Sequence, residues 1–238
     1  MPPIVSTARQ DVAQTEMAAP KGIIFDWDNT LVDSWVCIHE AINRTLAHMG
    51  HPVWNMADMK DRVALSLRDS FPRLFGDRWE EAREVFYAAF AAIHLDYLKP
   101  LPGVIDMLKT LVAGGVRLSV VSNKNGSFLR EEVACLNWGG FFDRLVGATD
   151  AAEDKPAAAP VTLACAAMGC GEDDPVWFVG DAAVDMECAL NTCCVPVLLR
   201  ADQPRPGEFD RYPFRWHLKN CVSLTDLVRE LGVPISAN

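Results

Sequence analysis

The sequence predicts an α/β fold in which a doubly wound parallel sheet forms the core and an all-helical cap domain is inserted after the first strand. Short apolar runs bounded by turn residues alternate with helical patterns along most of the chain. One long stretch near the N-terminus has helical periodicity without any strand pattern. The alternation is typical of parallel strands joined by crossover helices, so the core is expected to be Rossmann-like.

Five apolar runs are each too short for a buried helix and are expected to form core strands. They span residues 22–26, 118–122, 145–148, 176–179 and 195–199. The helical patterns between them cover residues 104–114, 127–138, 157–168 and 184–191. Gly115, Gly139 and Gly169 stand where the first three of these helices are expected to end. A short helix near 223–231 follows a proline-containing segment that is expected to wrap the sheet edge.

The stretch from about Ser34 to Pro100 is too long for one crossover and too helical for a loop. Helical periodicity covers residues 36–49, 59–70 and 79–97, and prolines at 100 and 102 form the hinge that closes the segment. We therefore expect a disordered tail over 1–20, a core formed by 21–33 and 101–238, and a helical cap over 34–100.

Composition and charge narrow the possible partners and location. A net charge of -10 disfavours nucleic acid and anionic membranes, which would repel the chain. No apolar run reaches the roughly 18 residues that a membrane-spanning helix needs, and the first 20 residues lack the features of a secretory signal. Eight cysteines without paired spacing are typical of reduced thiols, so a cytoplasmic location is expected.

Two carboxylates, Asp26 and Asp28, stand two residues apart at the end of the first predicted strand. In an extended chain such side chains point to the same side, so both can approach one reaction centre. Two close carboxylates repel each other unless a cation or a proton lies between them. Asp is also common in turns after strands, so an ordinary turn remains the alternative for this pair alone.

Polar residues follow the second and third predicted strands as well. Ser122 and Asn123 end the second strand, where a hydroxyl and the amides of the next helix suit a phosphate. The same pair is also an ordinary helix cap. Lys155 follows the third strand just ahead of a helix, and taken alone it fits a solvated charge equally well.

The fourth predicted strand ends at Asp181, and Asp185 follows one helical turn later. Carboxylates in these positions face back towards the first strand's pair, which makes an oxygen-rich site of the kind that Mg²⁺ prefers. For Asp181 alone, a helix cap is the alternative. Because ligands of open α/β sheets bind where the carboxyl ends of the strands meet, the four polar motifs together indicate one shared site.

The four motifs resemble those of the haloacid dehalogenase superfamily, and most closely its phosphoglycolate phosphatase-like branch. They read Asp26-Trp-Asp28-Asn-Thr30-Leu-Val-Asp-Ser, Ser122-Asn123-Lys124, Asp154-Lys155-Pro156 and Gly180-Asp181-xxx-Asp185, and the resemblance covers residues 21 to about 200. The helical insertion between the first and second motifs also matches the cap of that branch. The first and fourth motifs are the specific ones.

The resemblance implies a Mg²⁺-dependent phosphatase that acts on a small phosphorylated metabolite. Asp26 would attack phosphorus to form an aspartyl phosphate, and Asp28 would protonate the leaving oxygen and then activate the hydrolytic water. Lys155 would neutralise phosphoryl charge and orient Asp26. The implied metal ligands are Asp26, the backbone carbonyl of Asp28, Asp181 and, directly or through water, Asp185; the implied substrate-binding residues are Thr30, Ser122 and Asn123.

Three positions depart from the family pattern. Asn29 occupies a position that is commonly Gly, and Asn tolerates a positive φ better than most residues. The third motif lacks the usual second proline, so the start of the next helix is expected to be displaced. Residues 191–194 replace a small, Gly-containing turn. None of these changes removes a charged group that the implied catalysis needs.

The cap is expected to set specificity, because it can exclude water and contact the rest of the substrate. Arg62 and Arg68 are candidates for facing the site, since a guanidinium would suit a second anionic group. The alternative places both on the surface of an amphipathic helix. The oligomeric state is expected to be monomer or homodimer.

Three other functions stay open. A phosphomutase of the β-phosphoglucomutase kind shares every motif and differs by passing the phosphoryl group to a sugar phosphate. A dehalogenase is disfavoured, because that chemistry uses no metal and lacks the second acid that is present here as Asp28. A catalytically silent scaffold is disfavoured by the intact charged set.

Overall fold

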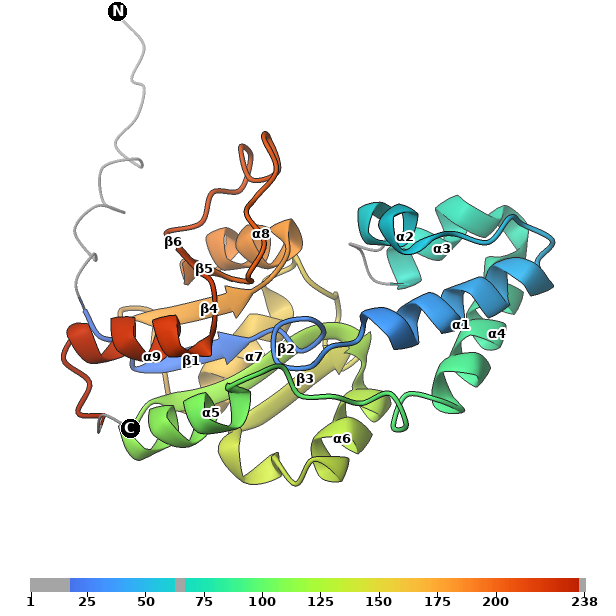
Figure 1. Cartoon of the computed structure of the whole chain (residues 1–238). Helices are drawn as coiled ribbons and strands as arrows, with labels where there is room; N and C mark the ends of the chain where they lie inside the picture. Colours follow the sequence, from blue (N-terminus) through green and yellow to red (C-terminus); the bar gives the residue numbers. More distant parts are fainter. Residues whose placement is uncertain (1–17, 63–66, 236–238) are drawn as a thin grey trace, which may run out of the picture.

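The computed structural model describes residues 18–62 and 67–235 (Figure 1), and the side chains at 60, 61 and 67–69 lie outside that description. Its core is one six-stranded parallel sheet in the order β3-β2-β1-β4-β5-β6. The strands are β1 (Gly22–Phe25), β2 (Arg117–Asn125), β3 (Arg144–Ala148), β4 (Val176–Gly180), β5 (Val195–Leu199) and β6 (Trp216–Leu218). All five predicted strands are present, and β6 adds a sixth beside β5.

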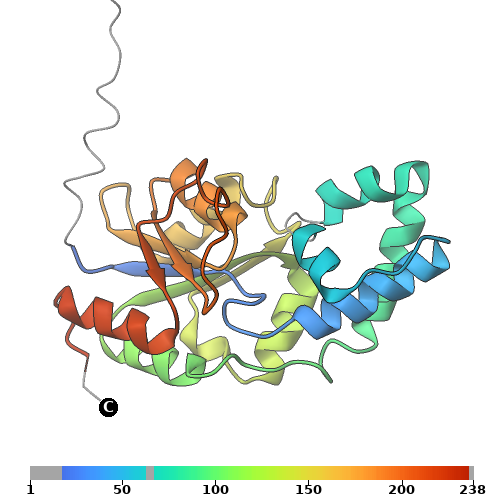
Figure 2. The ribbon, with the colours of Figure 1, turned by 45° about the horizontal axis from the view of Figure 1, so that its top comes forward.

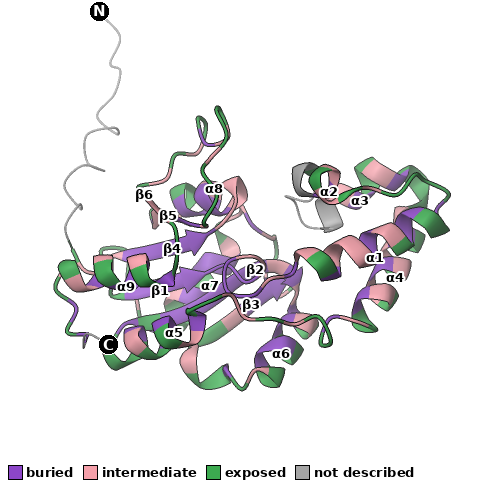
Figure 3. Ribbon diagram, viewed as in Figure 1, coloured by how far each residue is buried: buried purple, intermediate pink, exposed green. Residues whose placement is uncertain are grey.

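Helices cover both faces of the sheet, as the doubly wound prediction requires (Figure 1). One face carries α5 (Val104–Ala113), α6 (Gly126–Cys135) and α9 (Cys221–Glu230), and the other carries α7 (Ala159–Met168) and α8 (Ala183–Asn191). Ile23 and Phe25 point to the first face and Ile24 to the second, because side chains alternate along a strand. All three are fully buried, and the strands are the most buried part of the molecule in Figure 3.

Several helix ends differ from their predicted positions. Gly115 and Gly169, with φ of 81° and 66°, follow α5 and α7 as predicted. Helix α6 instead ends at Cys135, before Gly139, which begins a short 3-10 helix (Gly139–Phe141). Helix α7 begins at Ala159, two residues later than the pattern predicts, which fits the expected displacement.

The segment inserted after β1 consists, in its described residues, of helices joined by turns and loops. It contains α1 (Trp35–His48), α2 (Met56–Arg62), α3 (Leu67–Phe75), a 3-10 helix (Gly76–Arg78) and α4 (Trp79–Ala91). These helices bury their own apolar cluster, which includes Leu46, Phe71 and Phe86. The helical pattern predicted over 59–70 overlaps α2 and α3, and its middle, residues 63–66, lies outside the described part of the chain. Figure 2 shows the insertion beside the sheet, beyond the carboxyl ends of the strands.

The two connections between the insertion and the sheet run side by side. The backbone N–H of Asp33 donates to the carbonyl of Lys99 at 2.8 Å, and that of Leu101 donates to the carbonyl of Leu31 at 3.0 Å. Val32 also forms a bridge with Pro100. The chain therefore enters and leaves the inserted helices at one place.

Residues 1–17 of the expected tail lie outside the described part of the chain. Ala19 packs against the core, Pro20 is buried, and the N–H of Lys21 donates to the carbonyl of Pro175 at 2.9 Å. The ordered core therefore extends N-terminal to residue 21. In the described residues, no helix is long and apolar enough to cross a membrane, and the eight cysteines are free thiols.

Candidate active site

A pocket of about 160 Å³ lies at the carboxyl ends of β1, β2 and β4, and the inserted helices form part of its wall. Asp26 follows β1, which lies in the middle of the sheet between β2 and β4. The strand order reverses between β1 and β4, and ligands of doubly wound sheets bind at such a reversal. Seven predicted site residues line this pocket: Asp26, Asp28, Ser122, Asn123, Lys155, Asp181 and Asp185.

Lys155 joins two of the acids. Its ammonium Nζ lies 2.5 Å from Oδ1 of Asp26 and 2.8 Å from Oδ1 of Asp185. The side chains of Lys155 and Asp185 are 2% and 0% exposed, and that of Asp26 is 8% exposed, so solvent screens these interactions little. Lys155 is therefore placed to orient the Asp26 carboxylate.

Burial and repulsion between acids dominate the electrostatics. Burial raises the pKa of Asp26 to about 7; Lys155 opposes the rise, and Asp185 and Asp28 add to it. Burial also raises the pKa of Asp181, with Asp185 and Asp26 adding to the rise. For Lys155, burial lowers the pKa, but Asp185 and Asp26 raise it by more, so the ammonium stays charged. The site therefore holds more negative charge than one lysine offsets.

The donor set fits a Mg²⁺ ion. Asp26, Asp181 and Asp185 each offer a carboxylate oxygen, and the three oxygens lie within 4.8 Å of one another. Oxygen ligands are those that Mg²⁺ prefers, and a divalent cation would relieve the repulsion that raises the pKa values of Asp26 and Asp181. Thr30 is buried and donates from Oγ1 to Oδ1 of Asp181 at 3.5 Å, so it supports this acid group.

The turn between β4 and α8 places its two acids differently. Asp185 accepts from the backbone N–H of Ala182 at 3.0 Å, so Asp185 rather than Asp181 satisfies the helix start. Asp181 therefore does not cap this helix, which was the alternative that its position in the sequence allowed. Its own carbonyl accepts from Nη1 of Arg200 at 3.0 Å, and Arg200 in turn pairs with Glu208. This pair holds the turn from the β5 side.

Asp28 lies on the turn after β1, two residues beyond Asp26. Asn29 has a φ of 62°, as its tolerance of positive φ predicts, and its Oδ1 accepts from the backbone N–H of Ser34 at 3.1 Å. Oδ1 of Asp28 accepts from the Ser34 hydroxyl and lies 2.7 Å from Nζ of Lys124. The turn therefore fixes one carboxylate oxygen of Asp28.

The end of β2 carries the predicted phosphate-binding residues. Oγ of Ser122 accepts from the backbone N–H of Lys124 at 3.2 Å. Asn123 donates from Nδ2 to the carbonyl of Lys155 at 3.2 Å, so it ties the end of β2 to the loop that carries Lys155. Asn125, not Ser122 or Asn123, caps α6, because its side chain accepts from the N–H of Ser127.

Sequence reasoning missed the residues that surround Lys124. Glu132 of α6 pairs with Lys124, and Trp27 and His94 donate to the same carboxylate. A signal was present: Glu132 falls three residues after Leu129 and four before Leu136, within the apolar stripe of α6. An acid within such a stripe indicates a buried partner.

The inserted helices present mainly aromatic and aliphatic side chains to the pocket: Trp35, Ile38, Phe86, Tyr87 and Phe90. Phe128 of α6 meets this surface from the core side, with ring centroids 5.2 Å from Phe90 and 5.8 Å from Tyr87. Arg62 lies over the Trp54 ring, 4.9 Å from its centroid, and is not among the described residues that line the pocket. The side chain of Arg68 lies outside the described residues.

Comparisons with known proteins agree with this architecture. Residues 23–197 match the model of the family described as haloacid dehalogenase-like hydrolase. A phosphoglycolate phosphatase of Aquifex aeolicus is 31% identical over 166 residues, which cover 69% of this chain and 78% of the relative. A phosphoglycolate phosphatase of Pseudomonas savastanoi pv. phaseolicola is 28% identical over 199 residues, covering 79% of this chain and 72% of the relative.

Solved structures share the fold at lower identity. A haloacid dehalogenase-like family hydrolase from Streptococcus pneumoniae aligns with a TM-score of 0.77 at 21% identity, covering 87% of this chain and 98% of the other. A predicted phosphoglycolate phosphatase from Haemophilus somnus aligns with a TM-score of 0.76 at 21% identity, covering 89% and 99%. With the family match across most of the chain and the four motifs around one pocket, the chain belongs to the haloacid dehalogenase-like hydrolase family.

Proposed function

We propose that this protein is a Mg²⁺-dependent phosphomonoester hydrolase that acts on a small phosphorylated metabolite through an aspartyl-phosphate intermediate. The observation that carries the proposal is the meeting of Asp26, Asp181 and Asp185 around Lys155 at the end of the central strand. Family membership supports the hydrolase class, and the relatives named phosphoglycolate phosphatase support the phosphatase activity.

In the first half-reaction a carboxylate oxygen of Asp26 attacks the phosphorus atom. The bond between phosphorus and the leaving oxygen breaks, and that oxygen takes a proton from Asp28. Lys155 orients Asp26 through its 2.5 Å contact and offsets negative charge as the phosphoryl group is transferred. The products of this step are the free alcohol and the aspartyl phosphate.

In the second half-reaction water replaces the alcohol. Asp28 takes a proton from the water as its oxygen attacks phosphorus, and the bond between phosphorus and Asp26 breaks. Inorganic phosphate leaves, and Asp26 and Asp28 return to their starting states. Ser122 and nearby backbone N–H groups at the end of β2 bind the phosphoryl oxygens; the position of Ser122 in the pocket wall and the hydrogen bond from Asn123 to the Lys155 carbonyl support this assignment.

The residues that would hold Mg²⁺ are Asp26, Asp181, the backbone carbonyl of Asp28 and, directly or through water, Asp185. The bound cation would offset the repulsion between the anionic substrate and the acids of the pocket. Without a cation, a phosphate dianion would meet four carboxylates opposed by two lysines, since Asp28 and Lys124 also line the pocket. This imbalance supports the requirement for a metal.

The pocket supports a small substrate, because its volume is about 160 Å³ and the inserted helices form part of its wall. We propose that residues 34–100 act as the cap that determines which alcohol is accepted. The free thiols of the described chain are typical of a reducing compartment, which supports a cytoplasmic location.

The test is phosphate release by the purified protein from a panel of phosphorylated metabolites, including phosphoglycolate, with and without Mg²⁺. We expect Mg²⁺-dependent release that the Asp26→Asn variant lacks. Equal release by wild type and Asp26→Asn would overturn the proposal. Interconversion of sugar phosphates without net phosphate release would instead identify the phosphomutase, because both activities use the same aspartyl phosphate.

A further inference from the structure

A group of buried polar side chains stands behind Asp28 and has no part in the steps above. It consists of Trp27, His94, Lys124 and Glu132, and we refer to it as the Glu132 cluster. The side chains of Lys124 and Glu132 are only 5% and 2% exposed. Burying two charges costs several kcal/mol per ion before their attraction is counted, roughly as much as that attraction returns. A pair of apolar side chains would hold the fold as well, which indicates a functional use.

The Glu132 carboxylate is held on both of its oxygens. Nζ of Lys124 lies 2.8 Å from each oxygen, Nε1 of Trp27 donates to Oε2 at 2.6 Å, and Nδ1 of His94 lies 3.1 Å from Oε1. These four contacts from three residues hold the carboxylate in a single position. Glu132 can therefore serve as a rigid anchor for the lysine.

Lys124 connects the Glu132 carboxylate to Asp28. Its ammonium lies 2.7 Å from Oδ1 of Asp28 and 5.0 Å from the centroid of the Phe90 ring. The Ser34 hydroxyl donates to the same Oδ1. Since both contacts fall on Oδ1, Oδ2 is the oxygen left to exchange a proton with the leaving group. Burial lowers the pKa of Lys124, but Asp28 and Glu132 raise it by more, so the lysine keeps its charge.

We propose that Glu132 is a positioning residue, which holds the Lys124 ammonium against Oδ1 of Asp28 and thereby aims Oδ2 at the leaving oxygen and then at the hydrolytic water. This inference rests on the proposed function. It assigns Glu132 and Lys124 to the proton-transfer half of catalysis. Ser122 and Lys155, which are placed to contact the phosphoryl group and Asp26, lie outside the Glu132 cluster.

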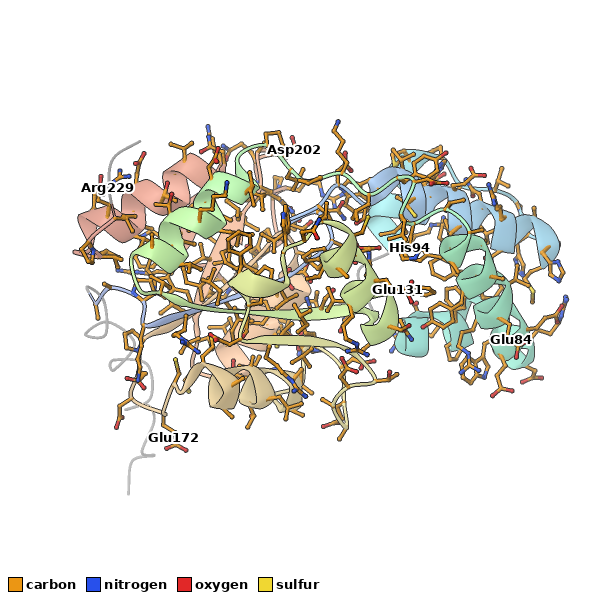
Figure 4. The ribbon with its side chains drawn as sticks, turned by 90° about the horizontal axis from the view of Figure 1, so that it is seen from below. Glu84, His94, Glu131, Glu172, Asp202 and Arg229 are labelled. Carbon is orange, nitrogen blue, oxygen red and sulfur yellow. The ribbon has the colours of Figure 1, made fainter. Side chains whose placement is uncertain are left out.

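The neighbouring Glu131 provides a matched control. Its Oε2 lies 3.4 Å from Nε2 of His94, but its side chain is 55% exposed and has no contact with Lys124 among the described interactions. Figure 4 shows Glu131 and His94 together, between α6 and the end of the inserted helices. Glu131→Gln removes the same charge from the same helix and leaves the contacts among Glu132, Lys124 and Asp28 in place.

The experiment compares wild type, Glu132→Gln and Glu131→Gln on two esters at saturating Mg²⁺: an alkyl phosphate that the wild type hydrolyses, and p-nitrophenyl phosphate. An alkoxide needs a proton to leave, whereas nitrophenolate does not. We expect Glu132→Gln to lower kcat on the alkyl ester by about 10²-fold, the lower end of what general acid–base catalysis contributes. KM should change little, because the groups placed to bind phosphate are intact.

Stopped-flow measurement on p-nitrophenyl phosphate gives the sharper result. Formation of the aspartyl phosphate should stay fast in Glu132→Gln, while its hydrolysis still needs Asp28 as the base. We expect a rapid burst of nitrophenolate of about one equivalent per site, followed by slow turnover. The Glu131→Gln variant should match wild type on both esters. The inference would be overturned if Glu132→Gln lost kcat equally on both esters without a burst, or if its activity equalled that of wild type.

Glu132→Gln leaves a buried ammonium short of one partner, which can destabilise the fold. The double variant Lys124→Met/Glu132→Gln removes both charges together. Circular dichroism and thermal melting are used to check that it folds. The same burst is expected from it, and its absence in the folded protein counts against the inference. If wild type and Asp26→Asn are equally inactive on every ester, the proposed function fails instead.

Discussion

The carboxylate of Asp26 is buried beside two other acids and one lysine, and this environment raises its pKa to about 7. In the unfolded chain the same group loses its proton near its ordinary pKa of about 4. Between these two values the folded state binds more protons than the unfolded state. Raising the pH through this window therefore removes stability from the metal-free protein.

The first prediction concerns this loss of stability. The melting temperature of the metal-free protein should fall as the pH rises from about 4.5 to about 7, because Asp26 ionises against its burial and its acidic neighbours. Thermal melts in EDTA across this range measure the effect. Asp26→Asn should flatten the profile, and an equally steep profile in that variant would assign the effect to another group.

The second prediction concerns the cation. A proton on Asp26 competes with Mg²⁺, so Mg²⁺ affinity should weaken by about tenfold for each pH unit below the pKa of about 7. Isothermal titration calorimetry at about pH 5.5, 6.5 and 8 measures the affinity and the protons released. The Asp181 pKa is raised as well, so the slope can only become steeper. An affinity that is constant with pH would contradict the proposed ligand set.

Asn29 shows how one backbone angle supports the site. A β-branched side chain at a φ of 62° costs about 1–2 kcal/mol, whereas glycine adopts this φ freely. Asn29→Val should therefore be less stable than Asn29→Gly by about that amount, and it should lose activity as Asp28 shifts. Urea unfolding of the two variants compares them directly. Equal stability of the two would show that the turn can relax.

At the scale of elements, the turn between β4 and α8 is packed too closely for a side chain at Gly180. A Cβ built there would lie 2.3 Å from Cγ of Asp185. Asp185 cannot move without losing its contacts to Lys155 and to the Ala182 N–H. The glycine therefore leaves room for the Asp185 carboxyl group against the end of β4.

Gly180→Ala should weaken Mg²⁺ binding by at least about tenfold, because it displaces Asp185 and, through Lys155, Asp26. Gly139→Ala is the matched control, since a Cβ there meets nothing within 4 Å. Calorimetric Mg²⁺ titration of the two variants provides the measurement. Unchanged affinity in a folded Gly180→Ala protein would show that Asp185 does not support the metal site.

At the scale of the whole molecule, the Phe128 ring joins the inserted helices to the core. Phe128 of α6 meets Phe90 and Tyr87 with centroid distances of 5.2 and 5.8 Å. Aromatic pairs contribute about 0.5–1.5 kcal/mol each beyond their buried area. Two such pairs favour the closed arrangement over an open one.

Phe128→Ala should raise KM by about tenfold and lower kcat less, because the cap would close over the substrate less often. Steady-state kinetics on the best substrate of the metabolite panel measures both constants. Val222→Ala is a control, since Val222 is 63% exposed on α9 and no described residue of that helix lines the pocket. An unchanged KM in Phe128→Ala would exclude this contact from closure.

The sequence predicts the sheet well because buried parallel strands leave strong apolar runs. It misses β6, whose three residues alternate with a polar histidine at the edge of the sheet. It also places Asp26, Lys155 and the β4 acids at one edge, since motif spacing and strand direction suffice for that. The role of Glu132 depends on contacts with Trp27 and His94, which lie 105 and 38 residues away. Contacts between residues so far apart in the sequence can be recognised only in the folded structure.

The paired connections at residues 31–33 and 99–101 have a consequence for how such proteins diversify. An inserted segment whose two ends lie side by side can be replaced by a segment of another length or shape with little disturbance of the core domain. Chimeras can be made in which the inserted helices of a relative replace those of this protein at the two junctions. Such chimeras are expected to keep the reaction catalysed by this protein's core and to take on the substrate preference of the relative.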